Sequence, residues 1–306
     1  MATKFGAFWI NPLAELPRKS KPIMTPPLGL PRGQVLELDK PLVMGILNVT
    51  PDSFSDGGRL HSSDEAIDAA HQMILDGADI IDIGGESTRP GAAPVAPDQE
   101  WARIAPVVEE LAKSGTPVSV DTRKAAVAGN SLQAGASIIN DVSAGADPDM
   151  FPTVAGSEAS IVLMHMRGLP QTMQDDTNYT DICSEVCASL QARAQAAIDA
   201  GIEPGRIALD PGIGFGKSAA GNIRLLQGLP GLVELGYPVV VGVSRKSFLG
   251  LLFGHELSER LDGSLAAGLF AITRGARILR VHDVANTRRA IDVWWTCHDD
   301  GRIASS

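Results

Sequence analysis

Short apolar runs recur along the chain from residue 41 onward, and each is followed by a polar or glycine-rich turn. These runs are rich in Val, Ile and Leu and show little alternation, which is typical of strands buried on both faces. The pattern therefore predicts eight strands, at residues 41–48, 79–85, 116–121, 136–141, 160–166, 206–212, 237–246 and 276–283.

Longer stretches with helical spacing lie between these strands. Five predicted helices each stop at a glycine just before the next strand, at residues 63–76, 98–113, 124–134, 181–200 and 258–274. Glycine suits this place because a helix end needs a residue that tolerates the left-handed conformation. A last helix is predicted at residues 284–296, where Trp294 and Trp295 cannot share one face, so one of them could meet a partner subunit.

Eight strand–helix repeats have two main solutions, a closed (β/α)8 barrel and an open doubly wound sheet. The count of eight and the polar residues at nearly every strand end favour the barrel, and no G-x-G-x-x-G follows the first strand. We therefore predict an α/β protein with one TIM-barrel domain over residues 35–298. Residues 1–34 hold six prolines and no period, which predicts an extended arm or a loose cover, and residues 299–306 form a short tail.

Composition narrows the class of protein. Hydrophobic residues make up 44% of the 306 positions and charged residues 20%, which is ordinary for a globular chain. No apolar stretch is long enough to span a membrane, and no signal peptide is evident. Three cysteines cannot form a disulfide framework, so we expect a reducing compartment, the cytoplasm. The net charge of −10 argues against nucleic-acid or membrane-surface binding, although a pocket can still be locally basic.

Polar side chains gather at the predicted carboxyl ends of the strands, which form the catalytic mouth in a barrel of this kind. Any single one could be a helix cap or a loop hydrogen bond, but the whole set favours a ligand site. The strand-end set is Asn48, Glu86, Asp121, Asn140, Asp141, His165, Asp210, Ser244, Lys246, Arg280 and His282.

Two kinds of chemistry are mixed in this set. Asp121, Asn140 and Asp210 offer acceptors, with one amide donor, and suit a flat heterocycle that carries several N–H groups. Lys246 can donate to a ring carbonyl or ring nitrogen. The donors Arg89, Arg280, His282 and the Asn48 amide suit a phosphate or diphosphate.

Metal motifs are sparse. The sequence has no H-E-x-x-H, no C-x-x-C and no dense histidine cluster, which argues against a protein-caged zinc. Magnesium accepts few protein ligands and keeps phosphate oxygens, so Asn48 could supply one neutral oxygen to a Mg²⁺ that a diphosphate carries. His165 could touch the heterocycle, but a packed barrel histidine explains it equally well.

Nine segments occur together in an order and spacing that resembles the dihydropteroate synthase family of folate biosynthesis. They are MGILNVTPDSFSDGG (44–58), IIDIGGESTRPGA (80–92), SVDT (119–122), IIND (138–141), LMHM (163–166), LDPGIGFGK (209–217), GVSRKSFLG (242–250), ERLDGSLA (259–266) and RVHDV (280–284). The match runs from about residue 41 to about residue 292 and leaves the first 34 residues outside.

The resemblance implies a transferase that joins 4-aminobenzoate to 6-hydroxymethyl-7,8-dihydropterin diphosphate, with Mg²⁺ as cofactor and a homodimer as the usual assembly. Diphosphate is expected to leave first and give a pterin cation, which the amine then attacks. The residues carried over fall into three groups: the pterin set Asp121, Asn140, Asp210 and Lys246, of which Asp121, Asp210 and Lys246 are the catalytic candidates; the diphosphate set Asn48, Arg89, Arg280 and His282, with Asn48 also on Mg²⁺; and the 4-aminobenzoate set Thr88, Pro90, Phe215 and Ser244.

Three other functions stay open at this stage. One is a methyltransferase that acts on methyltetrahydrofolate with a corrinoid partner, and a second is a barrel that binds pterin without catalysis. A third is a barrel that acts on a sugar phosphate. The segments NVTPDSFSDGG, STRPG and SRKS favour a diphosphate leaving group and an aryl amine over the methyltransferase. The loop at residues 48–59 and the charged floor are both present, which argues against a non-catalytic barrel, and a sugar phosphate does not explain Asn140 and Asp210 so well.

Overall fold

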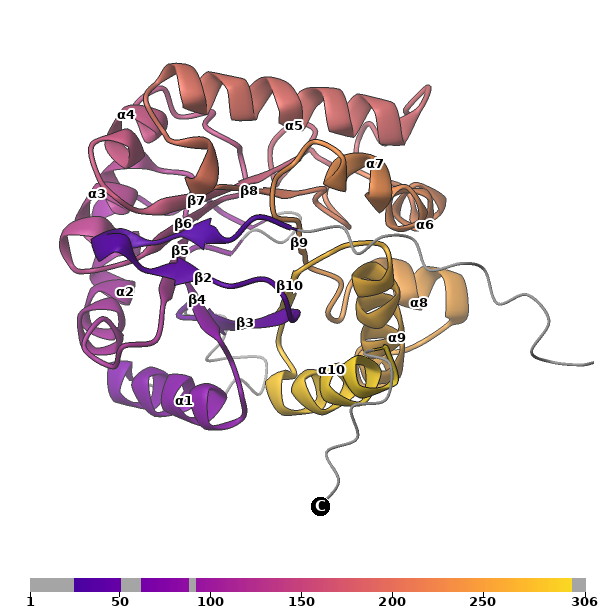
Figure 1. Cartoon of the computed structure of the whole chain (residues 1–306), viewed down its shortest axis with the longest axis horizontal. Coiled ribbons are helices and arrows are strands. Elements are labelled where there is room, and N and C mark those ends of the chain that lie inside the picture. Colours follow the sequence, from indigo (N-terminus) through magenta and orange to yellow (C-terminus); the bar gives the residue numbers. More distant parts are fainter. Residues whose placement is uncertain (1–24, 51–61, 88–91, 299–306) are drawn as a thin grey trace, which may run out of the picture.

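The computed structural model of the protein describes residues 25–50, 62–87 and 92–298 (Figure 1). All eight predicted strands are present: β3 (Leu42–Asn48), β4 (Ile80–Gly84), β5 (Val118–Asp121), β6 (Ile138–Asp141), β7 (Ser160–Met164), β8 (Ile207–Asp210), β9 (Val240–Val241) and β10 (Ile278–Val281). They form one parallel sheet in the order β8-β7-β6-β5-β4-β3-β10-β9. A parallel bridge between Leu209 and Val239 joins the two edges, so the sheet closes into the predicted barrel.

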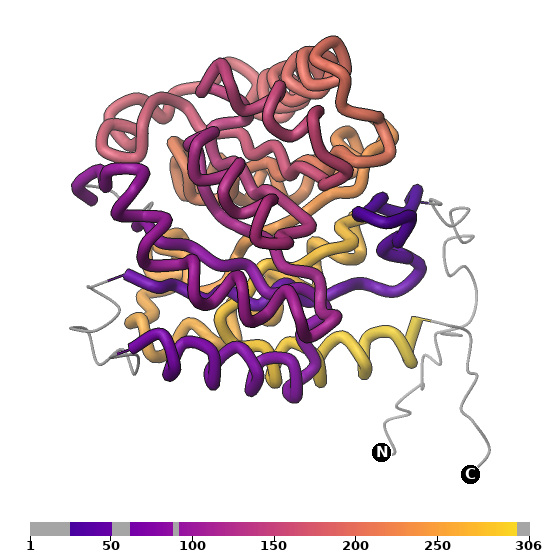
Figure 2. The backbone as a smooth tube through the Cα atoms, turned by 90° about the vertical axis from the view of Figure 1, so that its left-hand side faces the viewer, coloured from indigo at the N-terminus to yellow at the C-terminus, as the bar shows by residue number. Residues whose placement is uncertain are grey.

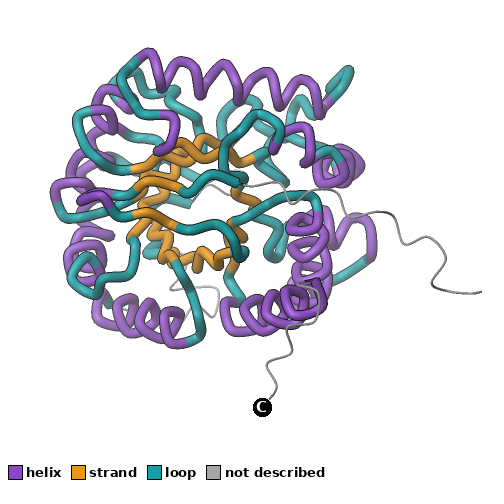
Figure 3. The backbone as a smooth tube through the Cα atoms, in the orientation of Figure 1, coloured by secondary structure: helices purple, strands orange, loops and turns teal. Residues whose placement is uncertain are grey.

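Helices surround this ring of strands (Figure 3). They are α1 (Ser63–Leu75), α2 (Pro97–Leu111), α3 (Ala125–Gln133), α4 (Met150–Ala155), α5 (Ile182–Asp199), α6 (Ala219–Gln227), α7 (Leu229–Val233), α8 (Ser247–Phe253), α9 (Arg260–Thr273) and α10 (Val284–His298). The first and last, α1 and α10, both contact β3 and lie on the same side of the barrel (Figure 2). The six predicted helices are confirmed, and the four shorter ones, α4 and α6 to α8, were not foreseen.

Local sequence signals explain where these helices start and stop. The Ser62 hydroxyl accepts a hydrogen bond from the Glu65 amide at 3.3 Å, which caps the start of α1. The five predicted helix-ending glycines all have positive φ, as a left-handed helix end requires: Gly77, Gly115, Gly135, Gly201 and Gly275.

Each strand has one face toward the helices and one toward the barrel interior. Because side chains alternate along a strand, neighbouring residues belong to different layers. Ile81, Ile139 and Leu279, for example, pack outward in the cluster under the helices. The inward residues of the amino-terminal half form a separate apolar cluster: Met44, Ile80, Ile138, Val162, Ala208, Val240 and Ile278.

A hairpin closes the amino-terminal end of the barrel. Strands β1 (Leu28–Gly29) and β2 (Val35–Leu36) pair antiparallel, and Leu28, Leu30 and Leu38 join the inner apolar cluster. The prediction of an arm or loose cover is therefore wrong for residues 28–30, since Leu28 and Leu30 are buried. The boundary predicted at residue 34 falls in the turn of this hairpin, while residues 1–24 and 299–306 lie outside the described residues.

Candidate active site

A polar layer lies directly above the apolar interior of the barrel. On several strands, a polar residue lies two positions after an inward apolar residue. These pairs are Ile80 and Asp82, Ile138 and Asn140, Ala208 and Asp210, and Ile278 and Arg280. Since residues two apart on a strand share a face, these side chains all point inward, one step nearer the mouth. The alternation that fills the core therefore also builds the floor of the mouth.

Arg280 links the acids of this floor. Its Nε donates to Oδ2 of Asp82 at 2.6 Å, and its Nη2 donates to Oδ2 of Asp121 at 2.6 Å. Charge-assisted contacts at two separate carboxylates hold the guanidinium in one place. Its third nitrogen, Nη1, has no hydrogen bond within the described part of the chain, so it is available to a ligand.

A pocket opens beside Arg280. Its lining residues are Asn140, Val142, Met164, Asp210, Gly212, Ile213, Phe215, Gly242, Lys246 and Arg280. The ammonium of Lys246 lies 4.0 Å from the centre of the Phe215 ring, in a cation–π contact. Five predicted site residues, Asn140, Asp210, Phe215, Lys246 and Arg280, thus line one pocket, and Asp121 reaches it through Arg280. An acid, an amide and a lysine thus line one pocket together with an aromatic ring, which suits a flat polar ring.

Burial changes the proton affinities of this site. It raises the pKa of Asp121 to about 7, although Arg280 acts in the opposite direction. Burial also raises the pKa of Asp210 and lowers the pKa of Lys246 to about 8, with Arg280 adding to the second effect. Asp121 and Lys246 therefore change charge near neutral pH, which is typical of catalytic sites.

His282 and Ser244 form a pair at the edge of the site. The backbone N of His282 donates to the Ser244 hydroxyl at 3.2 Å, and Nδ1 of His282 lies 3.1 Å from the same oxygen. Burial and then Arg280 lower the pKa of His282 to about 3, so the free imidazole is neutral at pH 7. Ser244 thus contacts a residue of the predicted diphosphate set, and it is not among the residues that line the pocket.

Asn48 lies near the acids of the floor. It pairs with Gly84 across the β3–β4 ladder, and a Cβ built on Gly84 would lie 3.7 Å from Oδ1 of Asn48 and 3.7 Å from Cβ of Asp121. The described residues contain no group of three or more His, Cys, Asp or Glu side chains that could hold a metal. The predicted site residues Thr88, Arg89 and Pro90 lie outside the described residues.

Two buried polar residues were missed from the sequence. Asp82 is fully buried, and Lys217 is 3% exposed. The Lys217 ammonium donates to the carbonyl oxygens of Phe215 at 2.7 Å and His165 at 3.1 Å, so it holds the loop that carries Phe215. Asp82 is enclosed in the apolar run IIDIG, where only the need of a buried charge for a partner marks it, and Lys217 lies in a glycine-rich loop rather than in an apolar run.

His165 is part of the contacts around Lys217 that hold the loop carrying Phe215. Its Nδ1 lies 3.0 Å from the Lys217 ammonium, and burial, followed by Lys217, lowers its pKa to about 3. The histidine is therefore a packed partner of Lys217 in this structure.

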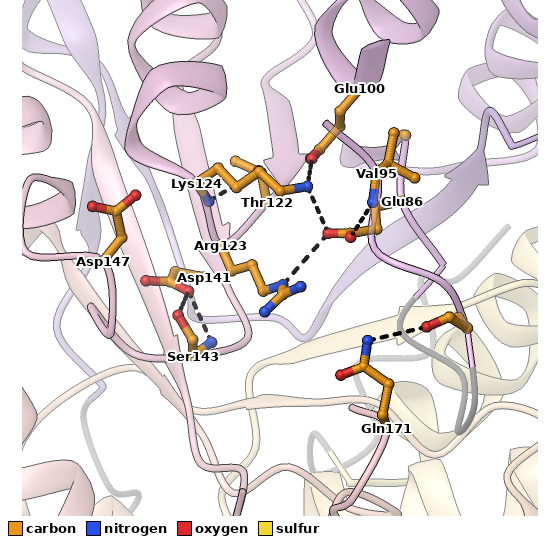
Figure 4. Close-up of polar contacts among 12 residues, drawn as sticks. Glu86, Val95, Glu100, Thr122, Arg123, Lys124, Asp141, Ser143, Asp147 and Gln171 are labelled. Carbon is orange, nitrogen blue, oxygen red and sulfur yellow. Dashed lines mark hydrogen bonds and ion pairs between the residues drawn. The ribbon is translucent and has the colours of Figure 1, made fainter. Parts of the chain in front are cut away.

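Glu86, another residue predicted at the mouth, supports the loop that follows β4. It accepts hydrogen bonds from the Val95 amide at 2.9 Å and from Lys124 at 2.9 Å, and Lys124 also pairs with the buried Glu100 (Figure 4). Gln171 reaches the carbonyl of Ala92 from the loop after β7. These contacts hold residues 92–95, and Glu86 is not among the residues that line the pocket.

The glycine-rich loop after β8 makes a testable contact. Gly212 has φ +66° and donates its N–H to Oδ1 of Asp210 at 2.7 Å, and a Cβ there would lie 1.9 Å from the His165 carbonyl oxygen. Because backbone must move to admit a methyl group, we expect Gly212→Ala to lower the free energy of unfolding by more than about 1 kcal/mol. The matched control is Gly231→Ala, whose Cβ would meet nothing within 4 Å, and urea unfolding compares the two variants. Equal stability of both would contradict the placement of the loop.

The fold and the site define a barrel enzyme that binds a flat, nitrogen-rich ring together with an anion. Comparison with known proteins agrees: residues 44–282 match the model of the pterin binding enzyme family. The chain is 50% identical to the dihydropteroate synthase of Neisseria meningitidis serogroup B over 84% of its length and 93% of that protein. It is 46% identical to the Escherichia coli K12 dihydropteroate synthase over 86% of its length and 93% of that protein.

Solved structures agree with this. Xanthomonas albilineans dihydropteroate synthase with 4-aminobenzoic acid superposes with a TM-score of 0.83 at 47% identity, covering 90% of this chain and 98% of that one. The Burkholderia cenocepacia enzyme complexed with 7,8-dihydropteroate has a TM-score of 0.82 at 44% identity, covering 90% and 97%. The chain belongs to the pterin-binding enzyme family and, within it, to the dihydropteroate synthases. It is therefore a transferase. Among its described helices, none is long and apolar enough to cross a membrane.

Proposed function

We propose that this chain joins 4-aminobenzoate to 6-hydroxymethyl-7,8-dihydropterin diphosphate and releases 7,8-dihydropteroate and diphosphate, as a step of folate biosynthesis. The observation that carries the proposal is the pocket that Asp210, Asn140 and Lys246 line together, with the Phe215 ring in contact with the lysine. Two acceptors and one cationic donor match the N–H groups and the ring carbonyl of a pterin.

The acids of the floor supply the catalysis in this proposal. When the bond from the pterin methylene to the diphosphate oxygen breaks, positive charge spreads over the methylene and the ring nitrogens. Asp121 and Asp210 are buried carboxylates that stabilise this charge as it develops. Fixed charges in a site of low dielectric act on the transition state more strongly than water does.

The leaving diphosphate is assigned to the basic side of the pocket. Arg280 offers Nη1, and the neutral imidazole of His282 beside Ser244 can donate a hydrogen bond to the departing group. The aryl amine then attacks the methylene beside Phe215. No general base is assigned, because the amine nitrogen becomes acidic only as it bonds.

The site suits a Mg²⁺ ion that is already bound to the diphosphate of the substrate. Mg²⁺ keeps several waters and phosphate oxygens, so it needs only one or two protein oxygens. The amide oxygen of Asn48, near Asp121, would supply one of them. The ion supplies charge neutralisation of the leaving diphosphate when it is bound, and the described residues hold no cage that would bind it alone.

The assembly is proposed to be a homodimer. Large apolar side chains are exposed on adjacent elements, with Leu251 at 75% and Phe253 at 59% on α8, and Leu257 at 58% just before α9. An apolar surface of this kind commonly marks a protein–protein interface. Sedimentation at micromolar concentration tests the proposal, and a species of monomer mass alone would contradict it. The three free thiols support a reducing compartment, and we propose the cytoplasm.

We expect the dependence of kcat/KM on pH to be bell-shaped. Asp121, with a pKa of about 7, must be ionised to stabilise the cation, so activity rises as pH increases through that value. Lys246, with a pKa of about 8, must stay protonated to hold the ring, so activity falls above that value. The maximum is expected between these two pH values. Circular dichroism over the same range is the control for unfolding, and a flat profile with the fold intact would contradict the assignment.

The experiment that tests the function mixes the protein with Mg²⁺, the pterin diphosphate and 4-aminobenzoate. The expected result is diphosphate release that requires both organic substrates and stops when the metal is chelated. Methyl transfer from methyltetrahydrofolate, or turnover of a sugar phosphate in place of the pterin, would contradict the proposal.

A further inference from the structure

Asp82 makes more contacts than any role in the proposed reaction explains. It is fully buried in the middle of β4, and three side chains from three other strands donate to it. Ser119 donates to Oδ1 at 2.6 Å, while Asn140 at 3.1 Å and Arg280 at 2.6 Å donate to Oδ2. Three donors fix the position of this buried carboxyl group, so Asp82 is a rigid anchor below the pocket.

The contact with Asn140 decides which end of that amide meets a ligand. An amide has a donor end and an acceptor end, and its orientation is set by its hydrogen-bond partners. The donor end, Nδ2, is bound to Asp82, so the carbonyl oxygen Oδ1 is turned away from Asp82. Since Asn140 lines the pocket, its acceptor is the end left for the ring. One N–H of the Asn140 amide is therefore bound to Asp82, and this contact fixes which end of the amide carries the acceptor.

We propose that Asp82 is the positioning residue that turns the carbonyl oxygen of Asn140 toward the ring and thereby selects the ring that the pocket binds. With Nδ2 of Asn140 held by Asp82, the acceptors that the floor presents are the carbonyl oxygen of Asn140 and the carboxylate of Asp210. Such a floor accepts a 2-amino-pyrimidinone edge, which presents adjacent N–H donors. It rejects the 2-oxo counterpart, whose carbonyl would face these oxygens with no donor between them. This inference rests on the proposed pterin site.

Selectivity separates this role from a purely structural one. If Asp82 only held the barrel together, its loss would weaken both rings in the same proportion. If it sets the orientation of Asn140, its loss lets the amide turn over and present a donor, which changes the ratio of the two affinities. The two ligands are 6-hydroxymethylpterin and 6-hydroxymethyl-lumazine, which differ in the 2-amino and 2-oxo group.

The experiment measures both affinities by isothermal titration for the wild type and for Asp82→Asn. We expect the preference of the wild type for the pterin to fall by ~10-fold or more in the variant, because one buried polar group left without its partner has an effect of that size. Ser119→Ala is the matched control. It removes a donor to the other oxygen of Asp82 and leaves Asn140 in place, so its preference should equal that of the wild type.

A double variant keeps the proposal testable if Asp82→Asn does not fold. Asp82→Asn with Asn140→Asp exchanges the two groups, keeps one carboxyl group and one amide in contact, and again places an acceptor toward the ring at position 140. We expect its preference to return toward the wild-type value. An unchanged preference in Asp82→Asn, or a folded double variant that does not prefer the pterin, would overturn the role of Asp82. Failure of the wild type to bind the pterin would instead overturn the proposed function.

Discussion

Asp121→Asn is expected to lower the turnover number by ~100- to 1000-fold while the affinity for the pterin changes little. The substitution keeps the size and the hydrogen-bonding shape of the side chain but removes the negative charge that stabilises the developing cation. Removing one preorganised electrostatic group from an active site typically has an effect of this size. Single-turnover kinetics with saturating 4-aminobenzoate measures the rate, and titration with 6-hydroxymethylpterin measures the affinity.

Asp147→Asn is a suitable control for this variant. Asp147 accepts a hydrogen bond from the Ala125 amide at the start of α3, away from the lining of the pocket, so loss of its charge should leave the turnover number near that of the wild type. Turnover of Asp121→Asn within a few-fold of the wild type, with binding unchanged, would show that this carboxylate does not stabilise a cation.

Arg280→Ala is expected to weaken the pterin diphosphate by ~30-fold or more and the alcohol without diphosphate much less. Truncating one member of a buried, hydrogen-bonded charge pair typically costs ~2–5 kcal/mol. The part of the affinity loss that is specific to the diphosphate comes from the lost donor Nη1. The loss of the contacts to Asp82 and Asp121 affects the binding of both ligands. The measurement is the ratio of the two dissociation constants, by titration at constant ionic strength.

Arg274→Ala provides the control, since Arg274 is exposed after α9 and lies over the Phe270 ring. It changes the net charge of the protein by the same amount but should leave the ratio unaltered. Equal losses for both ligands in Arg280→Ala would contradict the assignment of Arg280 to the diphosphate.

The barrel could be predicted from the sequence because two local signals agree. Apolar runs such as residues 206–212 mark strands buried on both faces, and positive-φ glycines such as Gly201 mark the preceding helix ends. The hairpin of Leu28 and Leu30 could not be predicted in the same way. It consists of two-residue strands whose burial depends on a barrel end that forms from distant segments.

The site was predictable where polar residues end a strand and hidden where they lie inside one. Asp121, Asn140 and Asp210 end apolar runs and therefore stand out, whereas Asp82 is enclosed in the run IIDIG. The pairing of Arg280 with Asp82 and Asp121 joins residues more than a hundred positions apart, so no local pattern contains it. The sequence placed Arg280 near the rim, while the structure places it between two acids of the floor.

The central claim is that positive charge develops on the pterin methylene before the amine bonds to it. The secondary isotope effect on kcat/KM, measured with the two methylene hydrogens replaced by deuterium, tests this claim most directly. Measuring it in Asp121→Asn as well ensures that bond breaking limits the rate. Because the methylene carbon becomes planar as diphosphate leaves, the substrate with ordinary hydrogen at the methylene should react faster than the deuterated one. An isotope effect at or below unity in both proteins would mean that the amine bonds as diphosphate departs, and the cation account would be wrong.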